Sequence, residues 1–120
     1  LTGRFKTEDS LDAADYRRNA PRFQGENFQR NLALLKEVEA IAAEKNATPG
    51  QVALAWVMAQ GDDIVPIPGT KRRVYLEENV AAEKLALTVG DLRRLAAAFP
   101  RGVASGERYQ AASMRSIDRS

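Results

Sequence analysis

The chain has 120 residues and a mass of 13.2 kDa, which allows one domain with a modest core. Apolar residues make up 44% and charged residues 28%, a globular balance that argues against disorder, and no apolar run approaches the roughly 20 residues of a membrane-spanning helix. Cysteine and histidine are absent, which excludes disulfides and thiolate metal sites, and a formal net charge of +2 argues against a strong polyanion binder.

Residues 1–25 are expected to form a long irregular segment with one helical turn near residues 13–18. Turn-forming residues are frequent in this segment and apolar anchors are few. Loops of this length in compact domains are usually functional or disordered. The segment also carries a basic cluster, which consists of Arg17, Arg18 and Arg22.

Two helices are predicted next. Apolar residues recur at steps of three and four from Glu26 to Lys45, which indicates an amphipathic helix, and Asn46 can stop it in the left-handed conformation. Thr48 and Gln51 have the spacing of a capping box, with a proline in the first turn, and predict a helix that ends near Ala59.

The pattern of residues 63–67 predicts a buried parallel strand, because the segment is short, rich in β-branched residues and apolar on both alternating faces. A helix over residues 73–82 and another from Thr88 and Asp91 to about Phe99 are expected to follow, and then a C-terminal tail over residues 101–120. A single strand has no partner for its hydrogen bonds. We therefore expect the chain, which begins at Leu1 without Met, to be a piece of a longer protein.

The turn between this strand and the next helix is the strongest candidate site. It contains Gly69, Thr70, Lys71 and Arg72, followed by Arg73. Backbone N–H groups at the start of a helix, together with a hydroxyl and two cations, can bind a phosphate group. The plain alternative is a solvated turn that happens to be basic.

Five segments taken in order resemble the C-terminal part of the aldo-keto reductases, NADPH-dependent enzymes built on a (β/α)8 TIM barrel. The resemblance reaches from the start of the chain to about Phe99. The segments are Leu1 to Phe5, Asp15 to Arg18 with Pro21 to Phe23, Thr48 to Trp56, Ile67 to Arg72, and Leu76 to Asn79.

The resemblance implies an α/β chain that is an incomplete C-terminal part of the barrel. Residues 1–120 would be a C-terminal fragment of one barrel domain, made of the last strand and its flanking helices. Within it, residues 1–25 would be a loop that covers the cofactor, and residues 101–120 the tail. The partners would be a small carbonyl substrate and the missing N-terminal part of the barrel, in a cytoplasmic setting without membrane or nucleic acid.

The same resemblance assigns cofactor-binding roles. In the family the turn at Gly69, Thr70, Lys71 and Arg72 holds the adenosine 2′-phosphate, which implies NADPH over NADH. Residues at the positions of Glu78 and Asn79 hydrogen-bond the adenine. Many relatives have Arg or Gln where this chain has Tyr75, so the chain departs from the family there, and the stacking expected of Tyr75 rests on the general ability of a tyrosine ring to stack on a base. Arg4 and Arg17 resemble loop residues that reach the cofactor, although loop arginines are more often solvated surface.

The reaction implied is reduction of an aldehyde or ketone to an alcohol. The family uses a Tyr acid with Lys, Asp and usually His on earlier strands, and Tyr16, Tyr75 and Tyr109 do not match that set. Trp56 is interpreted as core packing and not as a substrate contact. Two alternatives are a non-catalytic NADPH-binding regulatory subunit of the same fold and a basic nucleic-acid module. The near-neutral charge and the lack of interleaved aromatic residues argue against the second.

Overall fold

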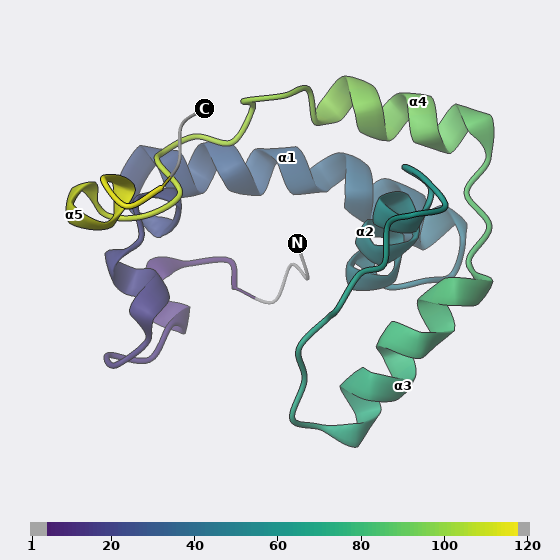
Figure 1. Ribbon diagram of the computed structural model, residues 1–120, viewed down its shortest axis with the longest axis horizontal. Coiled ribbons are helices and arrows are strands. Elements are labelled where there is room, and N and C mark those ends of the chain that lie inside the picture. The colour runs from purple at the N-terminus through teal and green to yellow at the C-terminus, as the bar shows by residue number, and fades with distance from the viewer. Residues whose placement is uncertain (1–4, 118–120) are drawn as a thin grey trace. The chain divides into compact units, whose positions relative to one another are not determined.

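The structure, a computed structural model, describes residues 5–117 (Figure 1). The described α-helices are α1 (Gly25–Glu44), α2 (Pro49–Met58), α3 (Arg73–Ala81), α4 (Val89–Ala98) and α5 (Ala111–Met114). The chain divides into two compact units, here called the central unit (residues 35–98) and the terminal unit (residues 5–34 with 99–117). None of the described helices is long and apolar enough to cross a membrane.

The helices of the central unit begin and end where local signals predict. Thr48 Oγ1 accepts a hydrogen bond from Gln51 N at 3.2 Å, and Gln51 Oε1 accepts one from Thr48 N at 2.9 Å, so the predicted capping box opens α2. Asn46 has a φ of 51°, the left-handed conformation expected after α1. The predicted helices at 26–45, 73–82 and 88–99 are confirmed as α1, α3 and α4 to within about a residue.

The core of the central unit forms where α1, α2 and α4 bury their apolar residues. Ile41 of α1 and Val52 of α2 have no exposed surface, and Leu95 of α4 is also buried. Helix α2 packs against α3 and against the short 3-10 turn Ala82–Lys84 that follows it. These contacts hold α3 beside α2.

Ion pairs fasten α4 to the C-terminal half of α1. Lys45 Nζ lies 2.8 Å from Asp91 Oδ2, and Arg94 pairs with both Glu37 and Glu44. Asp91 is 7% exposed and also accepts hydrogen bonds from Thr88 N and Thr88 Oγ1, each at 2.7 Å. The Lys45 ammonium, helped by Thr88, lowers the pKa of Asp91 from 3.8 to about 2.

The prediction of a strand over residues 63–67 is wrong. Residues 64–70 have no regular secondary structure, and no strand occurs in the part of the chain that the structure describes (Figure 1). A strand requires a neighbour to complete its hydrogen-bonded ladder, and no described segment pairs with this one. Its apolar side chains are therefore uncovered, with Val65 80% and Ile67 93% exposed.

The described part of the predicted irregular segment, residues 5–24, has 3-10 turns at Glu8–Ser10, Tyr16–Asn19 and Pro21–Phe23, whereas residues 1–4 lie outside the described residues. Asn31 holds the tail within the terminal unit: its amide donates to Arg22 O at 3.0 Å and Ser105 O at 2.9 Å, and accepts from Ser105 N at 2.8 Å. Gly106 follows with a φ of 86°, and a Cβ atom there would lie 3.0 Å from a backbone oxygen. The described part of the C-terminal tail is thus a loop with one short helix, held by hydrogen bonds at residue 105.

The low pKa of Asp91 predicts a pH-dependent contribution to stability. Since the pKa falls from 3.8 to about 2 on folding, the contribution is present above about pH 4 and is lost as the pH falls toward 2. In a complete polypeptide carrying this sequence, Asp91→Asn should lower the free energy of unfolding at pH 7, and its difference from the parent should shrink between about pH 4 and pH 2. Denaturant unfolding at several pH values measures this. Asp62→Asn, at an exposed carboxylate, controls for the change in net charge. A constant difference between parent and Asp91→Asn across this range would contradict the prediction.

Candidate functional site

The turn at residues 69–72 lies directly before α3, as the sequence predicts. Thr70 Oγ1 accepts a hydrogen bond from Arg72 N and donates one to Arg72 O, each at 3.2 Å, so the hydroxyl shapes the turn. Arg72 is the N-cap residue of α3, and no side chain caps the first turn of this helix among the described residues. The N–H groups of Arg73 and Val74 make no hydrogen bond among the described residues and are therefore open to an outside acceptor.

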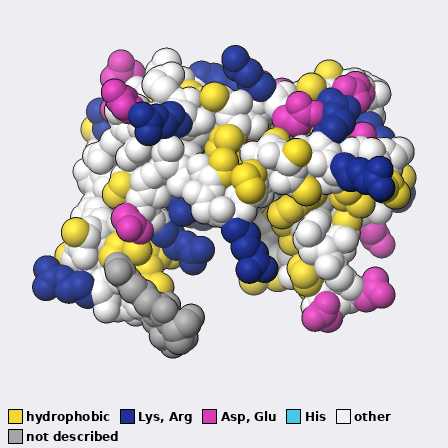
Figure 2. All heavy atoms as spheres, turned by 90° about the horizontal axis from the view of Figure 1, so that it is seen from above, with side chains coloured by type: hydrophobic (Ala, Val, Ile, Leu, Met, Phe, Trp, Pro, Cys, Tyr) yellow, Lys and Arg dark blue, Asp and Glu magenta, His cyan; other side chains and the backbone are white. Residues whose placement is uncertain are grey.

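The cations of the turn differ in their partners. Lys71 and Arg72 are exposed and make no ion pair within the described ranges, whereas Arg73 Nε lies 2.8 Å from Glu77 Oε1. Lys71 and Arg72 are thus free to meet an anion, and Arg73 is already paired. Figure 2 shows cations and acids interspersed on the face it displays, without one sign of charge covering it.

Glu78 and Asn79 are half-buried on α3, and Tyr75 is 37% exposed. Glu78 is joined to the start of α2: its Oε1 accepts from Thr48 Oγ1 at 2.7 Å, and its backbone oxygen accepts from Gln51 Nε2 at 3.0 Å. This tie spans about 30 residues of sequence and was not predicted. Thr48 and Gln51 carried only a local signal, that of a helix cap.

Asn79 lines an open, mainly apolar groove of about 460 Å³ in the central unit. Within the described part of the chain its side-chain amide makes no hydrogen bond to the protein, so both its donor and its acceptor groups are available. The other lining residues come from α2, residues 64–68, α3 and the 3-10 turn after it: Leu54, Met58, Ile64, Val65, Pro66, Pro68, Leu76, Val80 and Glu83.

The basic cluster of the terminal unit is engaged within that unit. The Arg17 guanidinium pairs with Asp15 at 2.5 Å and lies 4.2 Å from the centre of the Phe5 ring. Its hydrogen bonds lower the pKa of Asp15 to about 2. Arg18 and Arg22 donate to backbone oxygens of Leu11 and Gly106. Arg4 lies outside the described residues.

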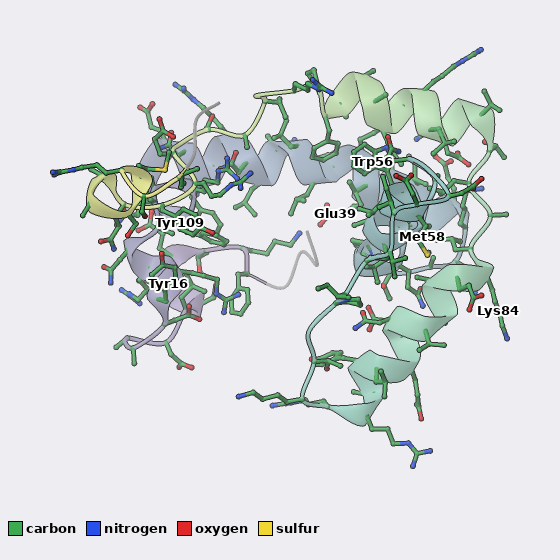
Figure 3. All side chains as sticks on the ribbon, viewed as in Figure 1. Tyr16, Glu39, Trp56, Met58, Lys84 and Tyr109 are labelled. Atoms are coloured by element: carbon green, nitrogen blue, oxygen red, sulfur yellow. The ribbon has the colours of Figure 1, made fainter. Side chains whose placement is uncertain are left out.

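Trp56 and Met58 follow one another closely on α2 (Figure 3) but differ in role. Met58 lines the groove, and Trp56 does not. Trp56 is half-buried, and its Nε1 atom is buried without a hydrogen-bond partner among the described residues. Tyr16 and Tyr109, also labelled in Figure 3, lie in the terminal unit and are 59% and 39% exposed.

Comparison with known proteins gives consistent matches. The model of the family described as "Aldo/keto reductase family" matches residues 1–99. The NADP(+) aldo-keto reductase yakc of Schizosaccharomyces pombe is 50% identical over 91% of this chain and 32% of its own length. Aldo-keto reductase str7 of Strobilurus tenacellus is 46% identical over 80% of the chain and 30% of its own length. A probable aldo-keto reductase 1 of Glycine max is 45% identical over 74% of the chain and 26% of its own length. The chain thus spans about a third or less of the length of these curated relatives.

Proposed function

Because the chain belongs to the aldo/keto reductase family, we propose that it holds the adenosine end of NADPH in an oxidoreductase that reduces aldehydes or ketones. The observation that carries this proposal is the arrangement before α3. Two unpaired cations, Lys71 and Arg72, stand beside a helix start that no described side chain caps. Bound NADPH would supply the hydride for the reduction.

The turn fits a phosphate dianion. Open N–H groups at the start of α3 and the positive end of the helix dipole favour an anion, and Lys71 and Arg72 add charge-assisted hydrogen bonds. Gly69 and Thr70 complete the turn, and the Thr70 hydroxyl holds its shape through Arg72. We assign this phosphate as the 2′-phosphate of the adenosine, the group that distinguishes NADPH from NADH.

The adenine would lie farther along α3. The Asn79 amide can both donate to and accept from the edge of a base, and it has no protein partner within the described residues. Glu78 can accept a hydrogen bond through its second carboxylate oxygen, since only Oε1 is bonded to Thr48. The Tyr75 ring is exposed enough to stack on the base.

Membership of the family implies a (β/α)8 barrel, and we place this chain at its C-terminal end. The rest of the barrel would supply the neighbours that residues 63–67 lack among the described residues, and would cover Val65 and Ile67. Residues 1–25, with Arg4 and Arg17, would be the loop over the cofactor, and residues 101–120 the tail. The groups that carry out the chemistry would belong to the rest of the barrel, in a cytoplasmic protein.

A non-catalytic NADPH-binding subunit of the same fold would use this site in the same way. Turnover distinguishes it from the enzyme: a complete polypeptide that binds NADPH but oxidises none in the presence of a panel of aldehydes and ketones is the regulatory subunit. Consumption of NADPH with formation of the alcohol identifies the enzyme.

One prediction from the proposed function concerns the two unpaired cations. In a complete polypeptide, Lys71→Ala and Arg72→Ala should each weaken NADPH binding by about 1.5 to 3 kcal/mol, roughly tenfold or more, because each removes a charge-assisted contact to the 2′-phosphate. NADH binding should change little. Calorimetric titration of both cofactors gives the dissociation constants.

Arg73→Ala is the matched control, because Arg73 is the neighbouring cation and is already paired with Glu77. It should leave the preference for NADPH over NADH near the parent value. Equal losses for NADPH and NADH in the Lys71 and Arg72 variants would place the 2′-phosphate elsewhere.

A second prediction concerns the adenine. Asn79→Ala should weaken NADPH and NADH alike by roughly 1 kcal/mol, a factor of about five, because it removes one hydrogen-bonding side chain. The turnover number at saturating cofactor should stay near that of the parent, since the adenine is remote from the reacting carbon. Steady-state kinetics with each cofactor checks this. A large fall in turnover with unchanged cofactor affinity would show that Asn79 has another role.

A further inference from the structure

We propose that Thr48 and Gln51, at the start of α2, are positioning residues for the nucleotide site and act on it through Glu78. This inference rests on the proposed function. Two hydrogen bonds carry it, one from Thr48 Oγ1 to Glu78 Oε1 at 2.7 Å and one from Gln51 Nε2 to the Glu78 backbone oxygen at 3.0 Å. Together they form what we call the Glu78 clamp.

The capping box fixes the direction of both bonds. Thr48 Oγ1 already accepts from Gln51 N, so its single proton is left for Glu78 Oε1. Gln51 Oε1 already accepts from Thr48 N, so its amide nitrogen is turned toward the Glu78 oxygen. The same two side chains therefore cap α2 and hold α3.

The clamp acts on both the side chain and the backbone of Glu78. The side-chain bond restricts the rotation of the carboxylate and leaves Oε2 without a hydrogen bond among the described residues. The backbone bond holds the turn of α3 that also carries Asn79, which lines the groove. Groups that are fixed before a ligand arrives lose less conformational entropy when it binds. The clamp thus prepares Glu78 and Asn79 to meet one edge of the adenine.

Adenine is common to NADPH and NADH, whereas the phosphate turn distinguishes them. Loss of the clamp should therefore weaken both cofactors by a similar factor and leave the preference between them unchanged. This signature separates the clamp from Lys71 and Arg72, whose loss should change the preference.

The test uses a complete polypeptide and calorimetric titration with NADPH and NADH. Thr48→Val keeps the shape but removes the hydroxyl, and should raise both dissociation constants about three- to tenfold. Thr48→Ser keeps the hydroxyl and should restore values near the parent. Thr88→Val is the matched control: Thr88 Oγ1 caps α4 through Asp91 N at 3.2 Å, the distance found for Thr48 and Gln51 N, but it makes no hydrogen bond to α3 among the described residues.

Gln51→Glu provides a second variant, which keeps the capping box of α2. Glu is a normal third residue of a capping box, so α2 keeps its cap, but the donor to the Glu78 oxygen is lost. It should weaken both cofactors by a similar two- to fivefold factor, about the effect of one hydrogen bond. If Thr48→Val does not fold, this variant alone decides the proposal.

A double-mutant cycle tests whether Thr48 acts through Glu78. Thr48→Val in a Glu78→Ala background should cost no further affinity, because the group it acts on is absent. Additive losses, unchanged affinity in Gln51→Glu, or an equal loss in Thr88→Val would overturn the proposal. A selective loss of NADPH binding in Lys71→Ala, together with clamp variants that bind both cofactors like the parent, would overturn the proposed role of the clamp but leave the proposed function standing.

Discussion

The candidate site depends on the attachment of α3 to the start of α2. Glu78 receives one hydrogen bond on its carboxylate from Thr48 and one on its backbone oxygen from Gln51. Helix α3 also packs against α2, but its apolar side chains add little burial: Val74, Leu76 and Val80 are each more than half exposed, and none of its residues is fully buried. Burial of apolar side chains is the usual source of helix stability in proteins. Because α3 buries little apolar surface, its two hydrogen bonds to α2 contribute an unusually large part of its attachment.

The turn at residues 69–72 lies directly before α3, the helix that Glu78 attaches to α2. It joins an extended segment without strand partners to a helix held by Glu78, and the Thr70 hydroxyl sets its local shape. Lys71 and Arg72 remain exposed, which would suit the proposed binding of a hydrated phosphate group. The site thus combines a fixed half, which is Glu78 with Asn79, and a solvated half, which is the turn.

Helices were predictable from the sequence because their signals are local. The Thr48 and Gln51 box, the Thr88 and Asp91 pair and the left-handed Asn46 each act within four residues, and each is found in the structure. The structure of residues 63–67 was not predictable in this way. A strand depends on partners that lie far away in sequence, and the described residues supply none.

The same distinction applies to the site. The open cations Lys71 and Arg72 could be proposed from composition and spacing, whereas the bond between Thr48 and Glu78 joins segments that no spacing rule connects. The ion pair between Arg17 and Asp15 joins residues only two positions apart, yet the sequence did not predict it. Whether Arg17 forms an ion pair or stays free depends on side-chain conformation, which composition does not determine.

The central claim is that the turn before α3 binds the 2′-phosphate of adenosine. Nuclear magnetic resonance of a complete polypeptide, isotopically labelled at Lys and Arg, measures this at the site during titration with adenosine 2′-monophosphate or adenosine 5′-monophosphate. We expect the 2′-phosphate compound to shift the backbone amides of Lys71, Arg72 and Arg73, and the 5′-phosphate compound to leave them nearly unchanged. Absence of these shifts, or equal shifts with both compounds, would contradict the account.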